Sequence, residues 1–342
     1  MTFPFNSISY AVCRAAVISA LAVISSPSLA QEAAASKQVT IGLIEEARPD
    51  VNPWAVAWHE SVEAMKRKDP SLKVIETYDA FDPVRAEPVA RQMIDAGVNV
   101  VGLTTFVLTD VAKNLSTDFP KVPMVAATFG VTRQPNLSSV TASYLEIGYA
   151  NCWLLTKLSK DGRLGVVGAK KAPFETEQLE GCKLGATAAN PSAQITLVNT
   201  NSFTDTQANR EQVKSLLDQG IQNIFLISGT SDLVGGLRLC ESSKAHCALI
   251  GGDRRWAPTA TVTNVMLDFG VVLADLVDQQ RTGIIKAKSF DLTFGNGGLK
   301  VPDFKGIDAV NPELEKGFQA MVADLASEKI SLPDSKSHPG MR

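Results

Sequence analysis

The sequence predicts an α/β protein with two doubly wound parallel-sheet lobes, joined by several crossings of the chain. From residue 39 onward, short apolar runs alternate with amphipathic segments, which is the pattern of successive strands and helices. The apolar runs are rich in β-branched residues and do not alternate with polar ones, as in strands buried on both faces. The pattern restarts near residue 143, which indicates a second lobe of the same kind.

The elements of the first lobe follow one another in regular order. We expect strands at 39–44, 72–78, 98–104 and 122–128, and helices at 55–68, 84–96 and 110–117.

The second lobe repeats this order. We expect helices at 144–159, 175–189, 207–219 and 232–243, and strands at 163–168, 193–198, 221–228 and 247–252. Two further helices are expected at 267–280 and 311–328.

These elements suggest how the chain divides. An N-terminal lobe covers 31–142 and receives 266–295 as a returning segment. A C-terminal lobe covers 143–265, and 296–342 packs on it. Two lobes connected in this way form a clamshell that can bend at the crossings.

The first 30 residues have the features of a secretory signal peptide. Arg14 precedes an apolar run, and Ser28, Leu29 and Ala30 fit a small-x-small cleavage site. The apolar run at 15–24 is shorter than the roughly 20 residues that span a bilayer. We expect cleavage after Ala30 and an exported, periplasmic protein without stable membrane insertion.

Charge and motifs exclude several classes of function. The formal net charge of −3 and the absence of Lys and Arg clusters argue against a nucleic-acid partner. No GxSxG, HExxH, P-loop or GxGxxG motif is present, and three histidines do not favour a zinc site. We expect no cofactor, no metal and no catalytic residue.

Aromatic residues gather at the predicted ends of strands. Only 6% of residues are aromatic, yet nearly every strand end carries one. Phe203 is the clearest case, because it stands in the polar turn "NSFTDT". Ligands of open α/β sheets lie beyond the carboxyl ends of the strands, so these rings suit a planar heteroaromatic ligand. In the alternative interpretation they cap the core of their own lobe, Phe81 and Phe129 first.

Two adjacent carboxylates, Glu45 and Glu46, follow the first strand. Neighbours at a strand end point in opposite directions, so at most one faces the cleft, and they form a poor acid–base pair. We selected Glu45 as the candidate.

Several stretches resemble the basic membrane protein family of ABC-transporter substrate-binding proteins. The resemblance is carried by "YLEIGYANCWLLTKLSKDGRLGVVG", "EQLEGCKLGATAANPSAQITLV", "NSFTDTQANREQVKSLLDQGIQNIF", "SGTSDLVGGLRLCE" and "ALIGGD". It implies a type I periplasmic-binding-protein fold and a purine nucleoside or nucleobase ligand.

The resemblance also implies roles for individual residues. Phe203 matches the base-stacking aromatic of the family, and Phe106 a second ring on the first lobe. Gly229 and Thr230 match the glycine-rich strand end that approaches the ligand. Asp253 matches an Asp that contacts the ribose hydroxyls in nucleoside binders.

The chain departs from the nucleoside binders at two places. Trp54 replaces part of their Asp-rich first loop, and Leu267 falls near their ribose-contacting Lys. The nucleobase branch has acidic and aromatic residues there, as in Asp268 and the residue after it. Two arginines, Arg254 and Arg255, leave an anionic ligand open.

Three functions fit these observations. The first is a periplasmic binding protein that delivers a purine-like ligand to an ABC permease with its cytoplasmic ATPase. The second is a ligand-binding sensor module of the same fold. The third is a secreted nucleoside-processing enzyme that uses Asp253 or Glu45.

Four cysteines remain after cleavage, and an exported protein can join them in three pairings. We hypothesise Cys240–Cys247, because a helix-to-strand turn separates them. We also hypothesise Cys152–Cys182, because the family tends to have a small residue and a Phe at these places on two helices. Two buried free thiols are the alternative for the second pair.

Overall fold

The structure is a computed structural model, and it describes residues 38–229, 231–251, 254–301 and 303–333. The expected signal peptide, residues 1–30, and two candidate site residues, Thr230 and Asp253, lie outside this description. Among the residues described, no helix is both long and apolar enough to cross a bilayer.

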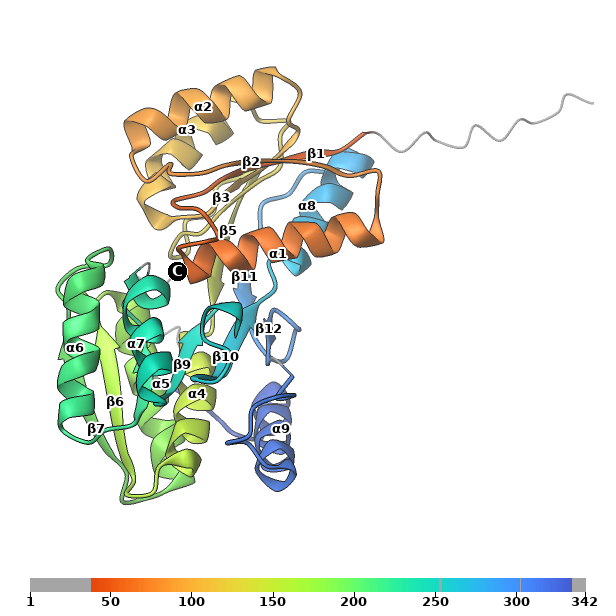
Figure 1. Cartoon of the computed structure of the whole chain (residues 1–342). Coiled ribbons are helices and arrows are strands. Elements are labelled where there is room, and N and C mark those ends of the chain that lie inside the picture. Colours follow the sequence, from red (N-terminus) through yellow and green to blue (C-terminus); the bar gives the residue numbers. More distant parts are fainter. Residues whose placement is uncertain (1–37, 230, 252–253, 302, 334–342) are drawn as a thin grey trace, which may run out of the picture. The chain divides into compact units, whose positions relative to one another are not determined.

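The described chain forms two six-stranded sheets (Figure 1). The first has the order β11-β5-β4-β3-β1-β2, and all its strands are parallel. Its strands are β1 (Thr40–Ile44), β2 (Lys73–Thr77), β3 (Val100–Leu103), β4 (Met124–Ala126), β5 (Leu137–Ala142) and β11 (Ser289–Leu292).

The second sheet repeats this order as β12-β10-β9-β8-β6-β7. Its strands are β6 (Arg163–Gly168), β7 (Gln194–Asn199), β8 (Asn223–Leu226), β9 (His246–Ile250), β10 (Thr261–Leu267) and the antiparallel edge strand β12 (Leu299–Lys300). In each sheet the first strand along the chain pairs with both the second and the third, which is a doubly wound topology. The predicted fold class is therefore confirmed.

Helices cover both faces of the first sheet. Helices α1 (Pro53–Lys68) and α8 (Gly270–Thr282) pack together on one face, and α2 (Pro83–Asp95) and α3 (Thr109–Asp118) on the other. Asn52 sets the start of α1, because its side-chain oxygen accepts hydrogen bonds from the backbone N–H groups of Trp54 (2.8 Å) and Ala55 (3.2 Å). This cap directs the first turn of α1 to the end of β1.

The second sheet is covered in the same manner. Helix α4 (Tyr144–Leu158) packs on one face, and both α5 (Pro173–Ala189) and α9 (Pro312–Ala326) pack against α4. Helices α6 (Thr206–Asp218) and α7 (Leu237–Ser243) contact the strands from the other face.

The chain passes from one sheet to the other three times, after β5, after β10 and between β11 and β12. The crossings are linked: Ser143 N–H donates to the carbonyl of Leu292, and Asp268 N–H to that of Gly298, each at 2.8 Å. The expected boundaries 142/143 and 295/296 lie at crossings, whereas 265/266 lies inside β10, so we propose lobe boundaries at 142/143, 267/268 and 295/296.

Two expected helices differ from the structure. The helix expected at 267–280 begins only at Gly270, because Leu267 still pairs with Leu299 in the sheet. The helix expected at 232–243 opens with a π-helical turn at Asp232–Gly236 and becomes α-helical at Leu237. In that turn Gly236 approaches α6 and its N–H donates to the side-chain oxygen of Asn209 (2.6 Å).

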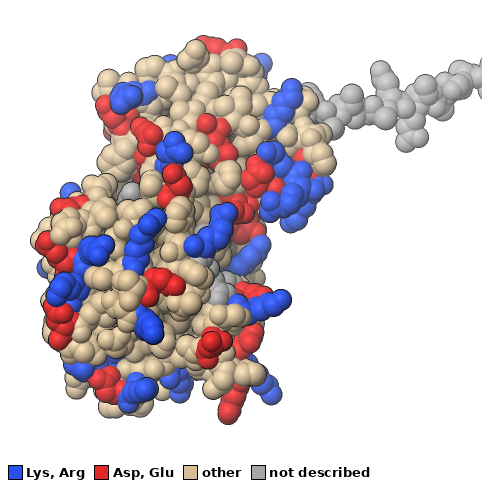
Figure 2. Space-filling view, in the orientation of Figure 1, with Lys and Arg blue, Asp and Glu red and all other residues tan. Residues whose placement is uncertain are grey.

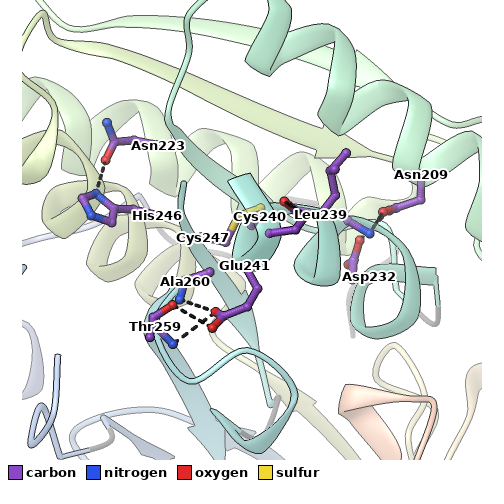
Figure 3. The surroundings of a disulfide bond; sticks show 12 residues. Asn209, Asn223, Asp232, Leu239, Cys240, Glu241, His246, Cys247, Thr259 and Ala260 are labelled. Atoms are coloured by element: carbon purple, nitrogen blue, oxygen red, sulfur yellow. Dashed lines mark hydrogen bonds between the residues drawn. A yellow bond between two sulfur atoms is a disulfide. The ribbon is translucent and has the colours of Figure 1, made fainter. Parts of the chain in front are cut away.

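Both hypothesised disulfides are present in the structure. Cys152 of α4 is joined to Cys182 of α5 with 4.9 Å between the α-carbons. Cys240 of α7 is joined to Cys247 of β9 with a spacing of 6.4 Å. Figure 3 shows Glu241 beside this second bond, where its carboxylate accepts hydrogen bonds from the residues that precede β10, Thr259 and Ala260.

Candidate functional site

A cavity of about 330 Å³ lies where strands of both sheets end. Both lobes contribute to its wall. The lining residues of the first lobe are Glu46, Ala47, Asn52, Pro53, Trp54, Phe81, Thr104, Thr105, Phe106, Ala127, Thr128, Phe129, Val140 and Thr141. Those of the second are Tyr144, Phe174, Gln178, Phe203, Thr204, Ile227, Gly229 and Ile250.

Trp54 is the most firmly held ring of the first lobe. Its indole Nε1–H donates to the backbone carbonyl of Thr104 (2.6 Å), at the end of β3. Its edge packs on Phe269, with ring centroids 5.1 Å apart at 72°. Phe269 in turn stacks on Trp58 at 3.7 Å and 7°, and both of these rings are fully buried. These ring contacts and the hydrogen bond fix the orientation of the Trp54 ring at the pocket.

Phe106 and Phe129 form a second aromatic group on the first lobe, with ring centroids 5.7 Å apart. Phe106 is 40% exposed and Phe81 is 50% exposed. Both line the pocket, so the core-capping interpretation of Phe81 is wrong. Their exposed surface is available to a ligand.

Phe203 lies on the second lobe, in the turn before α6. Asp205 caps that helix by accepting from the N–H of Ala208 (2.9 Å), and the cap holds the turn at the end of β7. The Phe203 ring is 5.8 Å from that of Phe174, which is 5.8 Å from Tyr144. The Lys170 ammonium lies 5.8 Å from the Phe203 ring centre.

A buried carboxylate holds the loop beside Phe203. Asp232 accepts hydrogen bonds from Gly229 N–H (2.8 Å) and from the side-chain nitrogen of Asn209 (2.8 Å). Burial raises the pKa of Asp232 to about 7, against the hydrogen bonds that lower it. Gly229 has φ +84°, which favours glycine, and a side chain added there would contact Phe203.

The polar groups of the pocket are few. Glu46 is the one charged side chain among the described lining residues, and its Oε1 accepts from the Asn52 amide (2.8 Å). Burial raises the pKa of Glu46, whereas the hydrogen bond from Asn52 lowers it. On the opposite lobe, the side-chain oxygen of Gln178 is buried and has no hydrogen-bond partner among the described residues.

The structure brings four of the predicted site residues to the pocket: Phe203, Phe106, Trp54 and Gly229. Two others lie elsewhere. Glu45 is fully buried outside the lining, and burial together with the charge of Glu76 raises its pKa to about 9. Asp268 pairs with Lys300 and accepts from Gly270 N–H, also outside the lining.

Glu46, Tyr144 and Gln178 were not among the predicted site residues. Tyr144 follows β5 by two residues, but that strand was not among those predicted, and Gln178 lies within α5, away from any strand end. Within the described part of the chain, no group of three or more His, Cys, Asp or Glu side chains could hold a metal ion.

Figure 2 shows acidic and basic side chains intermixed over the visible face.

Comparison with known proteins places the chain in a family. The model of the family described as "ABC transporter substrate-binding protein PnrA-like" matches residues 38–234. A protein named "Purine-binding protein" from Brucella abortus is 23% identical over 289 residues, which are 83% of this chain and 81% of the relative. "Basic membrane protein A1" from Borrelia garinii is 25% identical over 252 residues, 71% of this chain and 73% of the relative.

A solved structure supports the same fold. The solute-binding protein of an ABC transporter system from Conexibacter woesei superposes with a TM-score of 0.76 at 23% identity, over 87% of this chain and 99% of the other. The family match covers more than half of the chain and agrees with the two-lobed fold and its pocket. The chain belongs to the PnrA-like family of ABC-transporter substrate-binding proteins.

Proposed function

We propose that the protein is the periplasmic binding component of an ABC importer and that its ligand is a purine-like base held between aromatic side chains. The observation that carries this proposal is the composition of the pocket wall. Trp54 and Phe106 line it from the first lobe, and Phe174 and Phe203 from the second. Flat rings on both walls suit a flat ligand, because aromatic faces stack with an offset on one another.

The size of the pocket supports a small ligand. Its volume of about 330 Å³ is close to the lower end of the roughly 300–1,000 Å³ usual for small-molecule sites. A free base is small enough for this volume. Leu267, at the place of the family's ribose-contacting Lys, is buried in β10 and offers no hydrogen bond to a sugar hydroxyl.

The charge of the pocket supports a ligand without phosphate. The lining contains one carboxyl, Glu46, and no cationic side chain among the described residues. Arg255, considered above for an anionic ligand, is 76% exposed with its guanidinium 3.9 Å from Glu60, outside this lining. Glu46 is suited to accept hydrogen bonds from ring N–H or exocyclic amino groups.

The family and the expected signal peptide support delivery of the ligand to a permease. The Brucella relative is named a purine-binding protein, which supports the same ligand class here. The expected partner is a permease with its cytoplasmic ATPase.

Two measurements test this proposal. Mass spectrometry of the small molecules released by denaturing the purified protein should find a purine. Calorimetric titration of apo protein should show tighter binding of adenine, guanine or hypoxanthine than of the matching nucleosides, and no binding of AMP. Adenosine or guanosine bound at least tenfold tighter than its base would contradict the base preference, and binding of sugars alone would contradict the purine ligand.

A further inference from the structure

Gln178 of α5 has a buried side-chain oxygen that accepts no hydrogen bond from the described residues. The residue is 1% exposed, lines the pocket, and its side-chain oxygen has no hydrogen-bond partner among the described residues. An unpaired buried amide destabilises a folded protein, so such groups are uncommon unless something else binds them. The open side of this amide is the cavity.

Helix geometry places this amide below the stacking rings of the second lobe. Gln178 follows Phe174 by four residues, so both side chains project from the same face of α5. Phe174 contacts Phe203 and remains partly exposed, whereas Gln178 is almost completely buried. The rings therefore border the pocket, and the amide lies at its floor.

The backbone around Gln178 cannot shift to find another partner. A β-carbon at Gly148 of α4 would lie 2.0 Å from the backbone oxygen of Gln178. A β-carbon at Gly181 would lie 2.1 Å from the carbonyl of Leu145, and Cys182 is joined to Cys152 one turn beyond Gln178. Helix α5 is thus fixed against α4 on both sides of the residue.

We propose that Gln178 determines ligand specificity by binding the edge of the ring that stacks at Phe203. The amide donates one hydrogen bond from its NH₂ and accepts one at its C=O, and rotation of the amide exchanges the two positions. It therefore selects a heterocycle with a donor and an acceptor side by side on one edge, as Gln selects adenine in DNA. Glu46 faces the ligand from the opposite lobe and accepts a further N–H. This inference rests on the proposed purine-like ligand.

The test compares wild type with Gln178→Met, an apolar side chain of similar length, and with Gln178→Leu. Adenine and hypoxanthine are titrated by calorimetry. We expect Kd to rise by roughly five- to 150-fold in both variants, the range of one bidentate contact. The melting temperature of the ligand-free variants should be equal to or higher than that of wild type, because the unpaired amide is removed. Gln222→Leu, an exposed position before β8, is the control and should change neither quantity.

Methylated hypoxanthines then identify the edge that is bound. A methyl group on the N–H that the amide contacts should abolish the difference in Kd between wild type and Gln178→Met. The position of that methyl group identifies the N–H. Unchanged affinity in both variants, with wild type binding bases, would overturn the role of Gln178 and leave the proposed function intact. If the ligand-free variants show a lower melting temperature as well as a lower affinity, Gln178 contributes to packing and the specificity role is wrong. Failure of wild type to bind any base would overturn both proposals.

Discussion

The two walls of the pocket are held by different forces. In the first lobe, a hydrogen bond to Thr104 and an edge contact with Phe269 hold Trp54, and the buried Glu45 lies at the end of the strand behind the wall. In the second lobe, Tyr144 lies on α4 and Gln178 on α5. These two helices are in backbone contact at glycines and are joined by a disulfide.

This difference predicts different sensitivities. The helices of the second wall are joined by glycine contacts and a covalent bond, but carboxyls whose pKa is raised by burial lie in both lobes: Glu177 and Asp232 to about 7 in the second, and Glu45 to about 9 in the first. A wall that depends on a buried carboxyl changes its stability with the proton occupancy of that carboxyl. The second wall should respond to loss of the cross-link, whereas the first wall should lose stability with rising pH up to about 9, the raised pKa of Glu45.

The largest effect is expected from the disulfide of the second wall. Cys152 and Cys182 are 30 residues apart, and removing this bond with the double variant Cys152→Ala/Cys182→Ala should cost about 3–4 kcal/mol of unfolding free energy. Cys240 and Cys247 are 7 residues apart, so the matching double variant should cost about 2 kcal/mol. Urea unfolding measures both.

The second pair is the control for the first, and equal losses would contradict the loop-length argument. Thiol counting on denatured, unreduced protein lacking residues 1–30 should find no free thiol. A count of four would contradict both bonds.

The next effect concerns Glu45. Its pKa rises from an ordinary 4.5 to about 9 in the fold, so the folded protein retains a proton that the unfolded chain releases. Stability should therefore fall as pH rises from about 4.5 to about 9. Glu45→Gln removes this loss, on the order of 3 kcal/mol between pH 6 and pH 8.

Thermal unfolding at several pH values measures this difference. Glu211→Gln, at an exposed position of α6, is the control and should follow wild type. Parallel pH profiles for Glu45→Gln and wild type would show that Glu45 titrates normally in the fold.

Phe203→Ala tests the stacking surface of the second wall. Loss of one ring from a stacked base costs roughly 1–3 kcal/mol, or about five- to 150-fold in Kd. The melting temperature of the ligand-free protein should change little, because Phe203 is partly exposed. Phe119→Ala, outside the pocket, should leave Kd unchanged. If Phe203→Ala retains full affinity but melts much earlier, the ring belongs to the core.

The smallest effect is expected for Trp54→Phe. A ring remains, but the hydrogen bond to Thr104 is lost, and a typical net value of about 0.5–1.5 kcal/mol gives a roughly two- to 12-fold weaker Kd. Calorimetry measures it, with Trp153→Phe on α4 as the control. If Trp54→Phe raises Kd as much as Phe203→Ala does, the first wall contributes as much to ligand affinity as the second.

Much of the fold follows from local sequence. Strand and helix periods alternate, and strands buried on both faces contain β-branched residues, so the order of elements can be predicted from neighbours along the chain. The candidate site was partly predictable for the same reason. Phe106, Phe203 and Gly229 follow strands directly, and the carboxyl ends of parallel strands meet at one edge.

The remaining site residues depended on contacts between distant segments. The N–H of Glu45 donates to the carbonyl of Thr77, which extends the pairing of β1 with β2 by one residue. Because of this additional backbone hydrogen bond, Glu45 lies outside the pocket lining and Glu46 is part of it. Asp268 was predicted to bind the ligand because of its place in the chain. In the structure its carboxylate forms an ion pair with Lys300, 32 residues later.

The sequence by itself determined the two-lobed α/β architecture and the aromatic ends of its strands, because both arise from short-range burial patterns. Only the tertiary structure decided which carboxyl faces the pocket and that a buried helix contributes Gln178. The direction of a side chain on a helix is set by the rotation of that helix against its neighbour. For α5, that rotation is set by glycine contacts with α4, and these form only when residues about 30 positions apart meet.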